Sequence, residues 1–212
     1  MLIFPDKRRI YYFRSVEEKQ KWVTAIQNAT GQSNVHDFYV MGQSLGNGRY
    51  AQVLRASHKI SGMDCAIKVI HKKHLSFTDI VLVRREIDVM KMCNHPNIIR
   101  LYDIFENHEF IYIVMELLKG GNFYNYLNDR NFTISERRAK QIAHDLATSI
   151  YFLHNFGIAH RDLKPENIMM TDTSDEATIK LVDFGLARPF APAESCADPL
   201  GTLCYVAPEI LT

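Results

Sequence analysis

The stretch His160-Arg161-Asp162-Leu163-Lys164-Pro165-Glu166-Asn167 places a carboxylate, an ammonium group and an amide close together in the chain. A carboxylate such as that of Asp162 can accept the proton of an attacking hydroxyl group. Asp183 follows in Leu181-Val182-Asp183-Phe184-Gly185, and the oxygens of Asn167 and Asp183 are hard ligands of the kind that Mg²⁺ prefers. The apolar runs at 168–170 and 178–182 predict two strands between these motifs. Two such motifs in this order indicate a polar site for proton acceptance and magnesium binding, rather than an ordinary buried turn.

A glycine-rich turn lies nearer the start of the chain, in Gly46-Asn47-Gly48-Arg49-Tyr50-Ala51-Gln52-Val53. Glycine lets backbone amides approach a phosphate without a Cβ in the way, and Ala51 stands where a third glycine would complete the pattern G-x-G-x-x-G-x-V. Alone, the pattern fits an ordinary hairpin turn equally well. The alternating strand at 65–70 strengthens the phosphate interpretation, because it carries one inward lysine, Lys68. The helix predicted at 75–92 supplies Glu86 as a partner for that lysine.

The order of these motifs, which ends in Ala207-Pro208-Glu209, resembles the signature set of protein kinases over residues 38–212. The resemblance implies an α+β, two-lobed kinase fold. Its small lobe has an antiparallel sheet and one helix, and its larger lobe is mainly helical and incomplete. Lys164 and the pair Gly201-Thr202 resemble the residues at these motif positions in serine/threonine kinases. The resemblance implies that Lys164 contacts the γ-phosphate and that Thr202 holds the carboxylate of Asp162 in position. The run at 162–167 and the front of the chain are together similar to calmodulin-kinase-like enzymes, protein kinase D among them.

The resemblance implies ATP and Mg²⁺ as cofactors. The catalytic group would be Asp162, Lys164, Asn167, Lys68, Glu86 and Thr202, and the metal ligands Asn167 and Asp183. Adenine carries a donor and an acceptor on one edge, which backbone groups near Glu116 and Leu118 would match. Val53 and Ala66 would cover one face of the ring and Met169 the other, with Met115 guarding the back of the pocket. The predicted nucleotide-binding residues are Leu45, Gly46, Asn47, Gly48, Val53, Ala66, Lys68, Met115, Glu116, Leu118, Met169 and Asp183.

Composition limits the class of protein. The chain has 212 residues, 47% of them hydrophobic, which is enough for a packed core. The formal net charge of +1 gives no argument for nucleic acid as a partner. No apolar run approaches the ~20 residues of a membrane-spanning helix. The four cysteines are scattered without metal-ligand spacing, which predicts reduced thiols and a cytoplasmic protein.

The first thirty residues do not fit the kinase pattern. The run at 10–13 predicts a strand, and Ser15 with Glu18 predicts a capped helix in which Trp22 and Ile26 recur at helical spacing. This pattern resembles the last strand and closing helix of a pleckstrin-homology domain. It also fits an amphipathic helix that packs on the domain that follows. Phosphoinositide contact would need a complete pleckstrin-homology domain, because no basic loop is present here.

The expected organisation is therefore a pleckstrin-homology-like remnant at 1–30, a polar linker at 31–37 and an incomplete kinase domain at 38–212. The small lobe would span about 38–117 and the partial larger lobe about 118–212, so the chain is expected to be truncated at both ends. The expected function is ATP-dependent transfer of the γ-phosphate to serine or threonine hydroxyls of protein substrates. The alternative is a truncated, catalytically weak, ATP-binding kinase-like interaction module. Asp198 stands where the family commonly carries an activating phosphate. It could pair with Arg161, or it could be a solvated acid of the loop.

Overall fold

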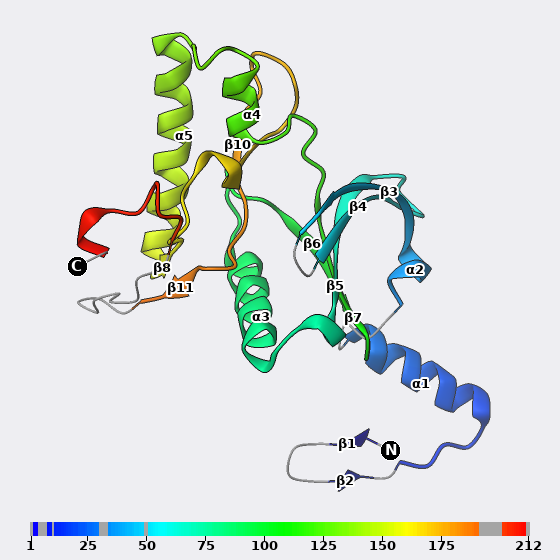
Figure 1. The fold of residues 1–212 in the computed structure, drawn as a ribbon. Helices are drawn as coiled ribbons and strands as arrows, with labels where there is room; N and C mark the ends of the chain where they lie inside the picture. Colours follow the sequence, from blue (N-terminus) through cyan, green and yellow to red (C-terminus); the bar gives the residue numbers. More distant parts are fainter. Residues whose placement is uncertain are drawn as a thin grey trace.

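The computed structural model describes residues 2–3, 8–9, 11–29, 34–48, 51–190 and 201–210. A five-stranded antiparallel sheet forms the small lobe, in the order β3-β4-β5-β7-β6 (Figure 1). The central strands β5 and β7 carry most of its buried apolar side chains, among them Ile67, Ile113 and Val114, which are fully buried. The bounds of the five strands are β3 Tyr39–Asn47, β4 Ala51–His58, β5 Asp64–His71, β6 Leu101–Glu106 and β7 Phe110–Glu116.

The single long helix of this lobe, α3 (Phe77–Met92), follows a short 3-10 turn at Lys72–His74. Ser76 caps it in a reciprocal capping box with Asp79, which satisfies two backbone N–H groups at the helix start. The helix ends at Met92, the end predicted from the sequence. The next strand begins only at Leu101, because residues 97–99 pair with β10 instead of entering the sheet.

The larger lobe is built on helix α5 (Glu136–Asn155), which Ser135 caps and the positive φ of Gly157 (64°) terminates. The shorter helix α4 (Phe123–Asn128) accompanies it (Figure 1). The two strands predicted beside the first motif form an antiparallel pair, β9 (Ile168–Met170) and β10 (Ile179–Leu181). The remaining elements are β8 (Ile158–Ala159), η2 (Pro165–Asn167), β11 (Arg188–Pro189) and η3 (Pro208–Ile210).

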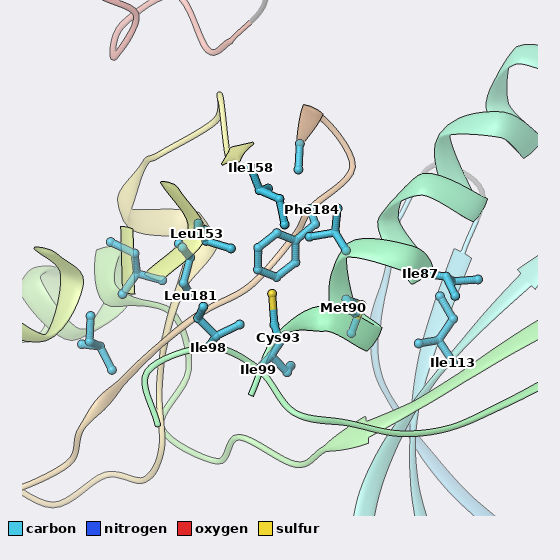
Figure 2. Close-up of a cluster of buried hydrophobic side chains, with 14 of the residues drawn as sticks. Ile87, Met90, Cys93, Ile98, Ile99, Ile113, Leu153, Ile158, Leu181 and Phe184 are labelled. Carbon is cyan, nitrogen blue, oxygen red and sulfur yellow. The ribbon is translucent and has the colours of Figure 1, made fainter. Parts of the chain in front are cut away.

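One large apolar cluster joins the two lobes. Phe184 lies within it and is 1% exposed, with Met90 from α3 on one side and Ile158 from β8 on another (Figure 2). Leu153, Leu181 and Ile113 are fully buried in the same cluster. Because side chains from both lobes meet around Phe184, the position of Asp183 beside it is fixed by close packing.

The front of the chain differs from the sequence expectation in two places. The predicted strand at 10–13 is wrong: residues 11–13 form no strand, and the short pair β1 (Leu2–Ile3) and β2 (Arg8–Arg9) lies earlier. The predicted linker also contains structure, because α2 (Val35–Phe38) buries Val35 to 1% exposure against the sheet. A single apolar residue in a polar stretch gives too weak a pattern to reveal such a contact.

Helix α1 (Val16–Ala29) forms as predicted, and Ser15 Oγ accepts the backbone N–H of Glu18 at 3.1 Å. Its Trp22 is 55% exposed, so the described residues do not bury this side chain against the sheet. The assignment of residues 1–30 to a pleckstrin-homology-like domain stays a prediction. Among the described residues, no helix combines the length and the apolar character needed to cross a membrane.

Candidate active site

A cleft of about 670 Å³ lies between the sheet and the β9–β10 ribbon. Ten of the predicted nucleotide-binding residues line it, drawn from both lobes: Leu45, Gly46, Val53, Ala66, Lys68, Met115, Glu116, Leu118, Met169 and Asp183. The predicted residues Asn47 and Gly48 do not line it. The Gly48 N–H bonds to the carbonyl of Ala51 at 2.7 Å, which closes the turn on itself. The cleft is large enough for a mononucleotide and mainly apolar where a base would lie.

Lys68 and Glu86 meet at the inner wall of the cleft. Lys68 projects from β5, and its Nζ donates to Glu86 Oε1 of α3 at 2.6 Å. The side chains are 24% and 8% exposed, so the pair is largely removed from water. The sequence predicted this pairing, and the register of β5 between β4 and β7 explains it: Val53 and Ile113 flank Lys68 in the sheet.

The Asp162 carboxylate accepts hydrogen bonds from three side chains. Oδ1 accepts the hydroxyl of Thr202 at 2.6 Å, and Oδ2 accepts Lys164 Nζ at 2.8 Å and Asn167 Nδ2 at 2.9 Å. Lys164 also donates to the Thr202 hydroxyl at 2.8 Å. The orientation of the Asp162 carboxylate is therefore fixed by residues from η2, from the loop before it and from the segment at 201–210.

These contacts decide the charge of Asp162. Burial alone raises the pKa of this carboxyl. The hydrogen bonds from Lys164, Thr202 and Asn167 outweigh that effect, so the net pKa lies below its usual value. The hydrogen bond to Asp162 raises the pKa of Lys164 in turn. The carboxylate is therefore ionised near neutral pH and the lysine is protonated.

His160 holds the loop at Asp162 in place through two hydrogen bonds to backbone groups. Its Nδ1 accepts the backbone N–H of Asp162 at 3.3 Å, so Nε2 carries the proton and donates to the carbonyl of Val182 at 3.2 Å. Burial lowers the pKa of this imidazole, which favours the neutral form that these bonds require. Its ring packs edge-on against Phe184, with centroids 5.3 Å apart. One residue thereby links the loop at Asp162 to the segment at Asp183.

Two residues of this region have a left-handed backbone, Arg161 with φ 66° and Asp183 with φ 62°. Neither is glycine, and this conformation is unfavourable for residues with a Cβ. Arg161 Nε donates to the carbonyl of Leu186 at 2.8 Å, and Asp183 Oδ1 accepts the N–H of Gly185 at 3.1 Å. Local hydrogen bonds thus accompany the strained backbone on both sides of the site.

Asn167 and Asp183 offer a fitting donor set for magnesium. The amide nitrogen of Asn167 donates both to the Asp162 carboxylate and to the Asp162 carbonyl at 2.9 Å, which directs the amide oxygen elsewhere. Asp183 is exposed and lines the cleft. The described ranges contain no group of three or more His, Cys, Asp or Glu side chains that would hold a metal alone. Two protein oxygens suit Mg²⁺, which commonly takes its other ligands from water and phosphate.

The hinge segment, residues 116–121, borders the outer end of the cleft. Glu116, Leu117, Leu118 and Lys119 line it, and the N–H of Lys119 bonds to the carbonyl of Thr171 at 3.0 Å.

Sequence reasoning missed several lining residues, namely Gln43, Arg55, Met90, Ile99, Leu117, Lys119, Gly121 and Val182. Val182 had a usable signal, since it directly precedes Asp183 in an apolar run. Asp198 and Arg49 lie outside the described residues.

The chain matches the family model of the protein kinase domain over residues 39–212. A probable myosin light chain kinase of Dictyostelium discoideum is 41% identical over 85% of this chain and 52% of its own length. The serine/threonine-protein kinase SIK1 of Mus musculus is 36% identical over 88% of the chain and 24% of its length. The calcium-dependent protein kinase 5 of Plasmodium berghei is 38% identical over 79% and 29%. The chain belongs to the protein kinase family, and it spans about half or less of these relatives' lengths.

Proposed function

We propose that this protein transfers the γ-phosphate of ATP to serine or threonine hydroxyls of protein substrates. The observation that carries the proposal is the triple hydrogen bonding of the Asp162 carboxylate beside a cleft whose inner wall holds the Lys68–Glu86 pair. One end of this arrangement suits a nucleotide, and the other suits a hydroxyl acceptor. The matches to serine/threonine kinases support the same reaction.

Asp162 would orient the acceptor hydroxyl and receive its proton. Because its pKa is lowered, the group is available as a carboxylate at neutral pH. The two oxygens of a carboxylate offer about four lone pairs. Thr202, Lys164 and Asn167 occupy three of them, which leaves one for the acceptor hydroxyl. Thr202 and Lys164 hold the carboxylate still, and Lys164 would also reach the transferred phosphate.

Lys68 would bind the α- and β-phosphates, and Glu86 would hold its ammonium group in position. Asn167 and Asp183 would hold Mg²⁺, which when bound neutralises phosphate charge as the reaction proceeds. Protein kinases generally use ATP and Mg²⁺, and the donor set described above fits both. The hinge segment would present backbone groups to adenine, with Met169 beneath the ring and Ala66 above it.

The test is phosphate transfer to a serine-containing peptide by the protein that carries these residues, in the presence of MgATP. We expect transfer by the wild type, and loss of at least about a hundredfold in Asp162→Asn with ATP binding retained. Asp88→Asn is the matched control, because Asp88 is 74% exposed and contacts Lys91 only at 3.9 Å. Near-normal turnover in Asp162→Asn would show that another group accepts the proton.

The alternative, an ATP-binding interaction module, gives a different result in the same assay. Such a module would bind MgATP and transfer no phosphate to any peptide of a serine/threonine library. Lys68, Glu86 and Asp183 line one cleft, and Asn167, which hydrogen-bonds Asp162, also bonds to the cleft residue Val182. This arrangement favours the enzyme.

A further inference from the structure

Residues 97–100, here called the strap, lie between α3 and β6, and residues 97–99 pair with β10. Asn97 Nδ2 donates to the carbonyl of Ile179 at 3.0 Å, and Leu181 N–H donates to the carbonyl of Asn97 at 2.8 Å. Ile99 N–H donates to the carbonyl of Leu181 at 3.0 Å. Leu181 precedes Asp183 by two residues, so the strap is attached to the strand that leads into a proposed metal ligand.

The other side of the strap is attached to the hinge segment. The N–H of Glu116 donates to the carbonyl of Arg100 at 3.0 Å, and the N–H of Arg100 donates to Glu116 Oε1 at 2.6 Å. Glu116 therefore binds Arg100 with its backbone and its side chain together. The second bond is charge-assisted, which makes it stronger than a bond between neutral groups.

A third contact closes this arrangement. Lys180 of β10 reaches the same oxygen, with Nζ 2.8 Å from Glu116 Oε1. The two side chains are only 13% and 17% exposed. Lys180 is also the register partner of Met169, the residue on the floor of the cleft. One carboxylate oxygen thus connects the hinge, the strap and the floor of the cleft.

We propose that Glu116 and Lys180 are positioning residues for the nucleotide, which set the spacing between the hinge and the β9–β10 ribbon through their ion pair. This inference rests on the proposed function, because it assigns these residues to the ATP-binding step of that reaction. The described contacts of the pair do not include Asp162.

The physical reason is geometric. The hinge would contact the edge of adenine. On the other side of the cleft, Met169 would contact the face of adenine and Asp183 would bind the metal. A nucleotide bridges both, so its affinity depends on the distance between them. Partly buried ion pairs often add little net stability, because desolvation offsets their attraction, yet they fix one relative position of the elements that carry them. Without Lys180, the Glu116 carboxylate would keep one strong donor only and would be drawn towards water.

The experiment measures the dissociation constant of MgATP by calorimetry, and separately kcat and the KM values for ATP and peptide. In Lys180→Met we expect the ATP dissociation constant and the KM for ATP to rise about tenfold, with kcat and the peptide KM within about twofold of wild type. Lys180→Arg, which keeps the pair, should bind ATP as the wild type does. Lys140→Met is the matched control, because Lys140 pairs with Glu136 at 2.7 Å on the surface, where the side chains are 75% and 82% exposed.

Glu116→Gln provides the second arm. As a single variant, Glu116→Gln should weaken ATP binding. When it is combined with Lys180→Met, the further loss of affinity should be small, because both changes break the same interaction. A purely structural role would lower the melting temperature and the active fraction without moving the ATP dissociation constant.

An unchanged ATP dissociation constant in folded Lys180→Met, or additive losses in the double variant, would overturn the proposal. If Lys180→Met does not fold, Glu116→Gln decides instead: an ATP dissociation constant equal to that of the wild type in this variant would overturn the proposal. Failure of the proposed function is recognised separately, by a wild type that binds no MgATP or transfers no phosphate.

Discussion

The hydroxyl of Thr202 donates to the Asp162 carboxylate across 2.6 Å, although forty residues separate the two along the chain. Thr202 belongs to the segment at 201–210, and Asp162 to the loop before η2. The orientation of the proposed proton acceptor therefore depends on a distant segment being in place.

This contact predicts the behaviour of two variants. Thr202→Ala should lower kcat about tenfold with little change in the KM for ATP, because it removes one of three donors to Asp162 and leaves the cleft unaltered. Thr202→Ser keeps the hydroxyl and should restore most of the rate. Steady-state kinetics of both variants with a serine peptide is the measurement. Equal losses in the two would point to the methyl group rather than the hydrogen bond.

The Lys68–Glu86 pair predicts a coupled loss of binding and stability. Lys68→Met should abolish detectable transfer and leave Glu86, which is 8% exposed, without its partner. We expect this to lower the free energy of unfolding by about 1–3 kcal/mol, because a mostly buried carboxylate is left unpaired. Urea denaturation compared with Lys91→Met, whose lysine is exposed, provides the measurement and the control. An unchanged midpoint in Lys68→Met would show that Glu86 finds another donor or water.

Gly120 predicts a packing effect at the hinge. A Cβ at this position would overlap the carbonyl oxygen of Asp172 and lie 2.5 Å from Met170 Cβ. Gly120→Ala should therefore destabilise the fold by about 1–3 kcal/mol, because backbone on both sides must move. Gly46→Ala is the control for stability, since a Cβ there meets nothing within 4 Å. Thermal unfolding of the two variants checks this, and equal midpoints would contradict the close approach.

The cysteines predict a pattern of chemical labelling. Burial raises the pKa of both Cys65 and Cys93 to about 11, so at pH 8 roughly one thiol in a thousand is the reactive thiolate. Their thiolates form only as the pH approaches 11, whereas Cys204 is exposed. Iodoacetamide at pH 8 followed by peptide mass spectrometry should modify Cys204 and spare Cys65 and Cys93 until urea is added; the fourth cysteine, Cys196, lies outside the described residues. Rapid labelling of Cys93 in the folded protein would mean that the region around Phe184 opens readily.

The kinase fold could be predicted from the sequence because its motifs combine chemistry with secondary structure. The strand carrying Lys68, the helix carrying Glu86 and the capped helix α5 each have a clear periodic pattern and a local start or stop signal. The strand at 10–13 failed because a short aromatic run has no such boundary signal. Val35 was missed because one buried residue does not make a pattern.

The candidate site was predicted less completely where contacts depend on tertiary packing. Lys68, Asp162 and Asp183 belong to motifs, so their place in the site followed from the order of those motifs. Asn47 and Gly48 were assigned to the nucleotide, but the turn closes on itself at Ala51. The Glu116 side chain was overlooked, since only its backbone had an evident role, and no local spacing connects it to Lys180.

The left-handed backbones of Arg161 and Asp183 have a consequence for protein engineering. Each costs about 1–2 kcal/mol relative to an ordinary helical or extended conformation, and glycine would relieve that cost. Glycine at either position would also delete a hydrogen-bonding side chain, Arg161 with Leu186 or Asp183 with Gly185, and with it a group beside the proposed proton acceptor or a proposed metal ligand. A library designed for durable enzymes should therefore hold residues 161 and 183 constant and look for stability elsewhere.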